Sequence, residues 1–147
     1  MRPAFSLIDY VPGPGPQRNF IRDSAWQSLR QSWPYSDVPR RELLARMTRE
    51  MAVPGTVTKI ITPVGSPDDF VGWISARPTA FTVVMVFIKS PFRKWGIATM
   101  ALRELCPDLD YTGKIGVVFM TPMAIQISAD HGHRLVPAHG FDYKEGK

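Results

Sequence analysis

The chain has 147 residues, which is enough for one domain with a single hydrophobic core and too short for a multi-domain machine. Apolar residues make up 44% of the sequence and charged residues only 21%, which argues against intrinsic disorder. The 14 prolines are about twice the usual share and leave no run long enough for an extended coiled coil.

The 18 Lys and Arg residues outnumber the 13 Asp and Glu residues, and the net charge of +5 favours an anionic partner such as a phosphorylated cofactor, an acidic protein face or nucleic acid. The cations are scattered, which makes nucleic acid the weakest of these interpretations. The uncharged stretches at 78–88 and 115–129 are too short or too polar for a membrane span, and the N-terminus lacks the apolar core of a signal peptide. We therefore expect a soluble, cytoplasmic protein without a membrane partner.

Prolines and glycines mark the N-terminal segment. Residues 11–16 read V-P-G-P-G-P and cannot continue a helix or a central strand. Residues 1–17 are therefore predicted to be a lead-in to a single domain over 18–147. Asn19 is a suitable N-cap, and the helical spacing of apolar residues behind it predicts a helix over 20–33.

A second helix is predicted directly after the first. Ser36 or Asp37 is suited to cap it, and an apolar stripe runs from Leu43 to Met51. The Pro-Gly pair at 54–55 is expected to end it. The N-terminal third is thus predicted to be a helical pair.

From Thr56 onward the sequence is rich in β-branched residues. The segments 56–62 and 70–76 are separated by the turn cluster P-V-G-S-P-D-D, which predicts an antiparallel hairpin. Asp68 and Asp69 lie in this turn, where aspartate serves local hydrogen bonding.

The remaining segments predict an α/β fold with a mixed sheet. Residues 82–89 and 115–120 are nearly continuous apolar runs typical of strands buried on both faces, and a helix is predicted between them at 95–105. Two such strands around a helix form a right-handed parallel crossover. A short helix over 123–129 and a last strand around Phe141 are expected to complete the domain.

The segment with the clearest chemistry is 88–102, I-K-S-P-F-R-K-W-G-I-A-T-M-A-L, where a strand leads through a turn into a helix. The unpaired N–H groups at such a helix N-terminus attract anions, and the small residues Gly96 and Ala98 let a phosphate approach the backbone. Arg93 and Lys94 add positive charge. The alternative is that Gly96 relieves a tight turn and the cations are simply solvated.

This segment resembles the acetyl-coenzyme A binding motif of the GNAT superfamily of N-acetyltransferases, Arg/Gln-x-x-Gly-x-Gly/Ala, which stands here as R-K-W-G-I-A at 93–98. F-V-G-W-I at 70–74 is similar to the family's third strand, and Gly-Phe at 140–141 to a pair near its C-terminus. The family's element order is similar to the predicted order over about residues 18–143. The residues that the resemblance assigns to the cofactor are Ile88, Arg93, Lys94, Trp95, Gly96, Ile97, Ala98 and Thr99.

The resemblance implies an acyl-CoA-dependent N-acyltransferase with acetyl-CoA as co-substrate. Pantetheine would add like a strand into a V-shaped opening between the two buried strands, with the pyrophosphate on the amides of 93–98. An amine of a protein or small molecule would attack the thioester, helped by a base and an acid. The helical pair borders the acceptor side in the family, so Tyr10, Tyr35 and Trp33 are candidates for shaping a substrate pocket, with core packing the alternative for Trp33.

The sequence departs from the family at the proton-transfer positions. Many members place a tyrosine acid about four residues before the Gly-Phe pair, where this chain has Val136, and the two buried strands contain no Asp or Glu. Ser128, His131 and His133 are the candidate substitutes, because a neutral histidine can serve as acid or base. The alternative for each of them is an ordinary surface loop residue.

A metal site and a catalytic cysteine are not predicted. D-H-G-H at 130–133 and His139 lack the cysteine or second carboxylate that would complete a tetrahedral set. Cys106 is the only cysteine, which excludes an intramolecular disulfide, and no base is arranged around it. It is interpreted as a small buried residue.

A second hypothesis is a catalytically degenerate GNAT-like fold. N-F-I-R-D-S-A-W at 19–26 is similar to small bacteriophage-encoded proteins of this fold, which implies a virion component or a host-interaction protein, in the virion or the host cytoplasm. Its partners would then be other virion proteins, host proteins or further copies of the chain. A third hypothesis, nucleic-acid binding, predicts an affinity that falls steeply with salt.

Overall fold

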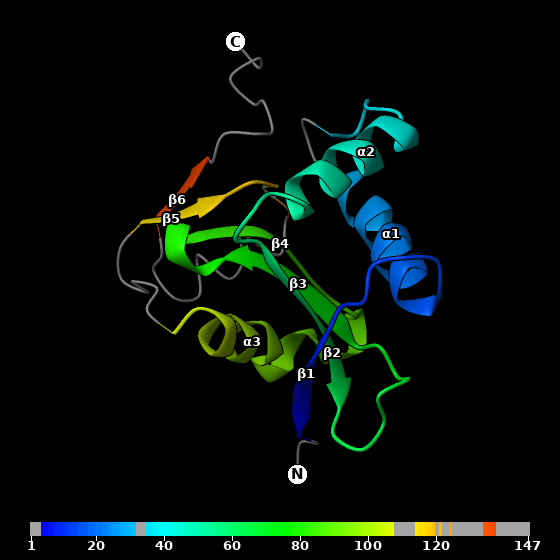
Figure 1. Cartoon of the computed structure of the whole chain (residues 1–147), viewed down its shortest axis with the longest axis vertical. Helices are drawn as coiled ribbons and strands as arrows, with labels where there is room; N and C mark the ends of the chain where they lie inside the picture. The colour runs from blue at the N-terminus through cyan, green and yellow to red at the C-terminus, as the bar shows by residue number, and fades with distance from the viewer. Residues whose placement is uncertain are drawn as a thin grey trace.

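A computed structural model of the chain describes residues 4–31, 35–107, 114–119, 121, 124 and 134–137, without the side chains of Lys94, Lys114 and 134–137. In this part a six-stranded sheet separates the helices α1 and α2 on one face from α3 on the other (Figure 1). The elements are β1 (Phe5–Asp9), α1 (Pro16–Leu29), α2 (Arg40–Met51), β2 (Val57–Pro63), β3 (Gly72–Arg77), the 3₁₀ helix η1 (Pro78–Ala80), β4 (Thr82–Ile88), the 3₁₀ helix η2 (Ser90–Trp95), α3 (Ile97–Leu105), β5 (Lys114–Val117) and β6 (Arg134–Pro137).

The sheet is mixed, and its strands lie side by side in chain order. Strands β1 to β4 pair antiparallel, whereas β5 is parallel to β4 and β6 is parallel to β5. The predicted hairpin is present as β2 and β3, and the predicted crossover as β4, α3 and β5. The α/β class with a mixed sheet is therefore confirmed. In the described part of the chain, no helix is long and apolar enough to cross a membrane.

The face under α1 and α2 is a core of large side chains. Trp73 and Met85 from the sheet pack there against Ile21 and Leu43 from the two helices. The indole Nε1 of Trp73 donates a hydrogen bond to Ser24 Oγ at 2.8 Å. Ser24 Oγ in turn donates to the backbone of α1, so the polar atoms in this core are satisfied.

The opposite face packs against α3. Ile61, Ile74 and Val86 from the sheet meet Ile97 and Leu102 from the helix, and all five are buried. Because β4 is covered on both faces, its sequence shows no alternation of apolar and polar residues. This burial on both faces is the reason that the apolar run of β4 predicts a central strand.

At the N-terminus the prediction was wrong. Phe5–Asp9, inside the expected lead-in of 1–17, forms β1, which pairs antiparallel with β2. Lys59 of β2 donates to the carboxylate of Asp9. This strand was not predicted because it is short and adjoins the Pro-Gly run. It lies at the edge of the sheet and pairs with one strand only.

Helix α1 begins at Pro16 and ends at Leu29, several residues earlier at each end than the predicted range of 20–33. Its N-cap is Gly15 and not Asn19. Proline suits the first helical position, because its preset φ is helical and the N–H that it lacks would be unpaired there.

Helix α2 begins at Arg40, and its N-cap is Pro39 instead of Ser36 or Asp37. The carbonyl of Pro39 accepts the first helical bond, from Leu43 N at 3.0 Å. The prolines therefore start both helices, and no side chain that the structure describes provides a cap hydrogen bond to either. Helix α2 ends at Met51, before the Pro-Gly pair, as predicted.

The last described strand is β6, and no strand was predicted over these residues from the sequence. It runs parallel to β5, with Val136 opposite Gly116. Most of the helix predicted over 123–129 and the strand predicted around Phe141 lie outside the described residues.

Candidate functional site

Strand β4 carries a β-bulge at Val84. Met85 lies opposite Ser75 of β3, but the next pair is Val83 with Ala76, so Val84 has no partner on β3. The side chains of Val84 and Met85 both enter the core under α1 and α2 instead of alternating. A bulge of this kind bends a strand and redirects its backbone groups.

The described pairing of β4 with β5 ends at the bulge. The parallel register joins Thr82 to Gly116 and Val83 to Val117. Two further bonds, from Val118 N to Val83 O at 3.0 Å and from Phe119 N to Val84 O at 3.1 Å, are the last ones between these strands among the described residues. No residue that the structure describes pairs with β4 on this side between the bulge and its end at residue 88. The predicted opening between the two strands stays a prediction, because most of the chain that follows Phe119 lies outside the described residues.

The backbone of β4 turns polar groups to this open edge. Lys89 N donates to Val71 O, on the β3 side, at 2.8 Å, whereas the carbonyl of Ile88 accepts from Arg93 Nε at 2.8 Å. Successive residues of a strand direct their N–H and C=O groups to opposite edges. Val86, two residues before Ile88, therefore turns both groups toward the opening.

The turn after β4 supplies unpaired donors. Gly96 has φ 72° and ψ 16°, a left-handed conformation that glycine adopts readily, and it is the N-cap of α3. Its carbonyl accepts from Met100 N at 3.0 Å, which starts the helix. The amides of Gly96, Ile97 and Ala98 lie at the N-terminus of α3, where the first N–H groups have no partner within the helix. These amides carry the positive end of the helix dipole.

Arg93 lies beside the same opening. Its Nε is held by Ile88 O, and its guanidinium lies 5.8 Å from the centre of the Phe87 ring. The two terminal nitrogens have no partner among the residues described, and Arg93 is exposed. The contacts thus orient the guanidinium and leave its outer donors available. The side chain of Lys94 lies outside the described atoms.

The other predicted cofactor residues mostly serve packing. Trp95 and Phe92 pack against Phe5 of β1, with ring centres 6.0 Å from Phe5 in each case, so these two aromatics turn away from β5. Ile97 is buried under the sheet, and Thr99 lies in the first turn of α3. The structure therefore brings together four of the predicted residues, Ile88, Arg93, Gly96 and Ala98.

The predicted proton-transfer residues Ser128, His131 and His133 lie outside the described residues, as do His139 and Trp33. In the described part, no group of His, Cys, Asp and Glu side chains is arranged to hold a metal ion. The roles given to Ser128, His131 and His133 stay predictions.

Cys106 is buried, as predicted, at the end of α3. Burial raises the pKa of its thiol to about 11, so the thiol is protonated at neutral pH and is a poor nucleophile. Tyr35 is fully buried with its ring 6.0 Å from that of Phe119, so it belongs to the core. Tyr10 is partly exposed and lines a cavity beside α1.

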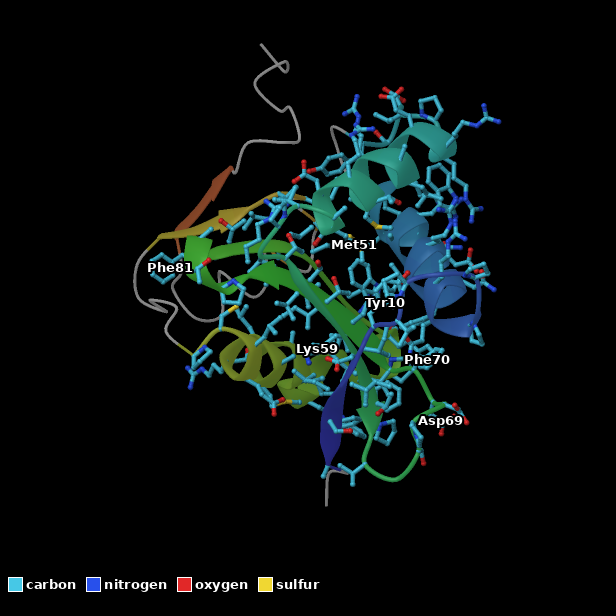
Figure 2. The ribbon with its side chains drawn as sticks, viewed as in Figure 1. Tyr10, Met51, Lys59, Asp69, Phe70 and Phe81 are labelled. Carbon is cyan, nitrogen blue, oxygen red and sulfur yellow. The ribbon has the colours of Figure 1, made fainter. Side chains whose placement is uncertain are left out.

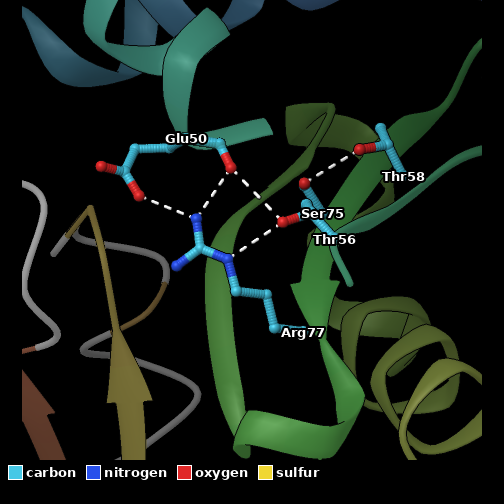
Figure 3. A network of polar contacts seen from close by, with 5 residues as sticks. All are labelled: Glu50, Thr56, Thr58, Ser75 and Arg77. Atoms are coloured by element: carbon cyan, nitrogen blue, oxygen red, sulfur yellow. Dashed lines mark hydrogen bonds and ion pairs between the residues drawn. The ribbon is translucent and has the colours of Figure 1, made fainter. Parts of the chain in front are cut away.

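Arg77 and Glu50 form a largely buried ion pair that was not predicted from the sequence (Figure 3). Arg77 Nη2 donates to the carboxylate and to the carbonyl of Glu50, each at 2.7 Å, and Arg77 Nε donates to Thr56 Oγ1 at 2.9 Å. These bonds link the C-terminal end of α2 to the C-terminal end of β3. That end of β3 is the one farther from η2. The two charges lie far apart in the sequence, and no local pattern links them.

No family model matches the chain, and no curated protein matches it. A similar solved structure is the crystal structure of an aminoglycoside 6'-N-acetyltransferase complexed with coenzyme A, with 22% sequence identity and a TM-score of 0.39. The alignment covers 88% of this chain and 57% of that one, so the chain spans little more than half the length of that protein. The likeness concerns the arrangement of helices and strands and assigns no role to any residue.

Proposed function

We propose that the protein binds an acyl-coenzyme A along β4, η2 and the start of α3, and transfers the acyl group, acetyl in the simplest case, to an amine. The observation that carries this proposal is the continuity of the unpaired edge of β4 with the N-terminal amides of α3. The edge of β4 at Val86 leads directly to the amides of Gly96, Ile97 and Ala98.

The edge of β4 suits the pantetheine arm. Pantetheine contains two amide groups, which bond to an open strand edge as another strand would. Val86 offers one N–H and one C=O for this purpose, and no described residue of the β5 segment pairs with them. The proposed arm therefore lies between β4 and β5, with its thioester toward the bulge.

The turn suits the pyrophosphate. Three adjacent amides at a helix N-terminus form a site for phosphate oxygens, and an oriented guanidinium adds charge-assisted hydrogen bonds. Gly96 has no side chain to shield the amides, and Arg93 is oriented by Ile88 O and Phe87. The net charge of +5 also favours an anionic cofactor.

In the proposed reaction the amine nitrogen attacks the thioester carbonyl carbon. A C–N bond forms, the C–S bond breaks, and the amine proton passes to a base or to water while the thiolate takes up a proton. We propose Ser128, His131 and His133 for these proton transfers. When the protein holds the amine next to the thioester, proximity alone provides much of the rate acceleration. A weak acid and a weak base are then sufficient for slow turnover.

Calorimetric titration with acetyl-CoA tests the binding step. We expect saturable heat for the unchanged protein and none for the double variant Arg93→Glu, Gly96→Glu, which places carboxylates where the phosphates would lie. The matched control is Arg30→Glu, Gly65→Glu, because Gly65 also has a positive φ, of 86°, and open space around it. Absence of heat at millimolar acetyl-CoA, or equal binding by the double variant, would contradict the proposal.

The second candidate is a protein that retains the fold without turnover, as a virion component or a host-interaction protein. The observation that favours it is Val136 at the usual place of the acid, together with two core strands without carboxylates. Release of free coenzyme A in the presence of a panel of amines distinguishes the candidates. Binding of acetyl-CoA without any release supports this second role.

A further inference from the structure

A cavity lies between the end of β1, the first turns of α1 and the end of α2. Its volume is about 400 Å³, and Figure 2 shows Tyr10 and Met51, which line it, between the sheet and the helices. It opens on the sheet face that carries α1 and α2, whereas the proposed pyrophosphate site lies at the start of α3, on the other face. The two sites are therefore separate.

Two cations without an acidic partner line this cavity. Arg18 and Arg22 lie one turn apart on α1, and none of the lining residues is acidic. The nearby carboxylates are engaged elsewhere, because Asp9 binds Lys59, Asp23 binds Arg40 and Glu50 binds Arg77. Arg18 and Arg22 consequently have no ion-pair partner among the residues described. Like charges at this spacing repel each other, and a bound anion removes that cost.

The rest of the lining combines one available hydroxyl with an apolar floor. Tyr10 Oη has no hydrogen-bond partner in the described part of the chain, whereas the hydroxyl groups of Thr56 and Thr58 are already bonded. Ile21 and Met47 are buried and form the floor. The cavity therefore offers cationic and phenolic donors at its wall and apolar surface beneath them.

We propose that this cavity binds a small organic anion, in which a carboxylate or phosphate monoester group is joined to an apolar body. Arg18 and Arg22 bind the anionic group, which guanidinium groups recognise through paired hydrogen bonds. Tyr10 donates a further hydrogen bond, and the apolar body covers Ile21 and Met47. This ligand is independent of the proposed acyl-CoA.

Phenyl phosphate and benzoate are suitable probes, because each joins an anionic group to one aromatic ring, and benzamide is their uncharged control. Titration followed by protein NMR should show saturable shifts around Tyr10 for at least one anion and none for benzamide. Binding of phenyl phosphate alone identifies a phosphate ester, and binding of benzoate alone identifies a carboxylate. No saturable shift with either probe overturns the proposal, as does equal binding of benzamide.

Single variants locate the site. Arg18→Gln and Arg22→Gln should each weaken binding roughly tenfold or more, as expected for loss of one charged hydrogen bond. Arg30→Gln removes the same charge from the end of the same helix and should leave the affinity unchanged. The double variant Arg93→Glu, Gly96→Glu should also bind the probe normally, which separates this site from that of the acyl-CoA. An equal loss in Arg30→Gln would show unspecific attraction by net charge and overturn the proposal.

Discussion

Arg77 is the one buried charged residue among those that the structure describes. It stabilises the fold only together with its partner, because burying either charge alone leaves it desolvated and unpaired. Its contacts to Glu50 and Thr56 join α2 to β3, two elements that backbone hydrogen bonds do not connect. At the scale of single residues, this pair is the main polar link between the helical layer and the sheet.

We predict that Arg77→Ala lowers the free energy of unfolding by about 3 to 5 kcal/mol, because it leaves the Glu50 carboxylate, whose side chain is only 12% exposed, without a counter-charge. The double variant Arg77→Met, Glu50→Met should recover much of this loss, since it removes both charges and keeps apolar volume. Urea denaturation measures both values. A single variant as stable as the unchanged protein would show that the pair contributes nothing.

Gly96 has a backbone role as the N-cap of α3 and, in the proposal above, a binding role as well. Apart from its chain neighbours, no described residue lies within 4 Å of the position that a Cβ would take, so Gly96→Ala should cost only the strain of its positive φ, about 1 to 2 kcal/mol. Gly65→Ala has the same strain and should cost the same in a denaturation experiment. Of the two variants, only Gly96→Ala should weaken acetyl-CoA binding. An equal loss of binding in Gly65→Ala would contradict the proposed binding role of Gly96.

Burial of Cys106 predicts a pH dependence. Burial raises the pKa of its thiol from 9.0 to about 11, so the unfolded chain loses this proton at lower pH than the folded protein does. The contribution of Cys106 to stability is thus present below about pH 9 and is lost as the pH rises toward about 11. Because other groups titrate in this range, the measurement is the difference in unfolding free energy between the unchanged protein and Cys106→Ala across that interval. A difference that does not change with pH would contradict the assignment.

The bulge in β4 and the unpaired edge that follows it define the proposed site. The bulge lies in the run Val83-Val84-Met85, where each side chain is apolar and suits either face of a doubly covered strand. For this reason the run predicted a buried strand but could not indicate where its register shifts. The resemblance of 93–98 to a known motif supplied the expectation of an opening that periodicity alone could not supply.

Hydrogen exchange tests the open edge of β4. We predict that the amide of Val86 becomes protected when acetyl-CoA binds, because pantetheine then accepts its hydrogen bond. The amide of Val118 is the control, since it already donates to Val83 O. Exchange at Val86 should slow by roughly tenfold or more while Val118 stays unchanged. Unchanged exchange at Val86 under saturating acetyl-CoA would place the cofactor elsewhere.

At the scale of the whole molecule, the sequence predicted the elements with strong patterns and missed those with weak ones. The hairpin and the crossover were predictable because each rests on a long apolar or β-branched run. Strand β1 was not, because its sequence F-S-L-I-D is short and adjoins the Pro-Gly run of 11–16. The Arg77–Glu50 pair was not predictable either, since tertiary packing alone brings the two charges together.

The three layers also explain how one small chain could hold two ligands. The sheet separates the cavity beside α1 from the start of α3, so an anion in that cavity and an acyl-CoA would not collide (Figure 1). Both proposals use the positive net charge, but they use different arginines, Arg18 and Arg22 in one and Arg93 in the other.

The central claim is that an acyl-CoA binds between β4 and β5. The most direct test is a crystal structure of the protein grown with coenzyme A. We expect pantetheine to bond to the backbone of Val86 and the pyrophosphate to lie on the amides of Gly96, Ile97 and Ala98, beside Arg93. Coenzyme A bound anywhere else on the protein, or a crystal without it at saturating concentration, would contradict the account.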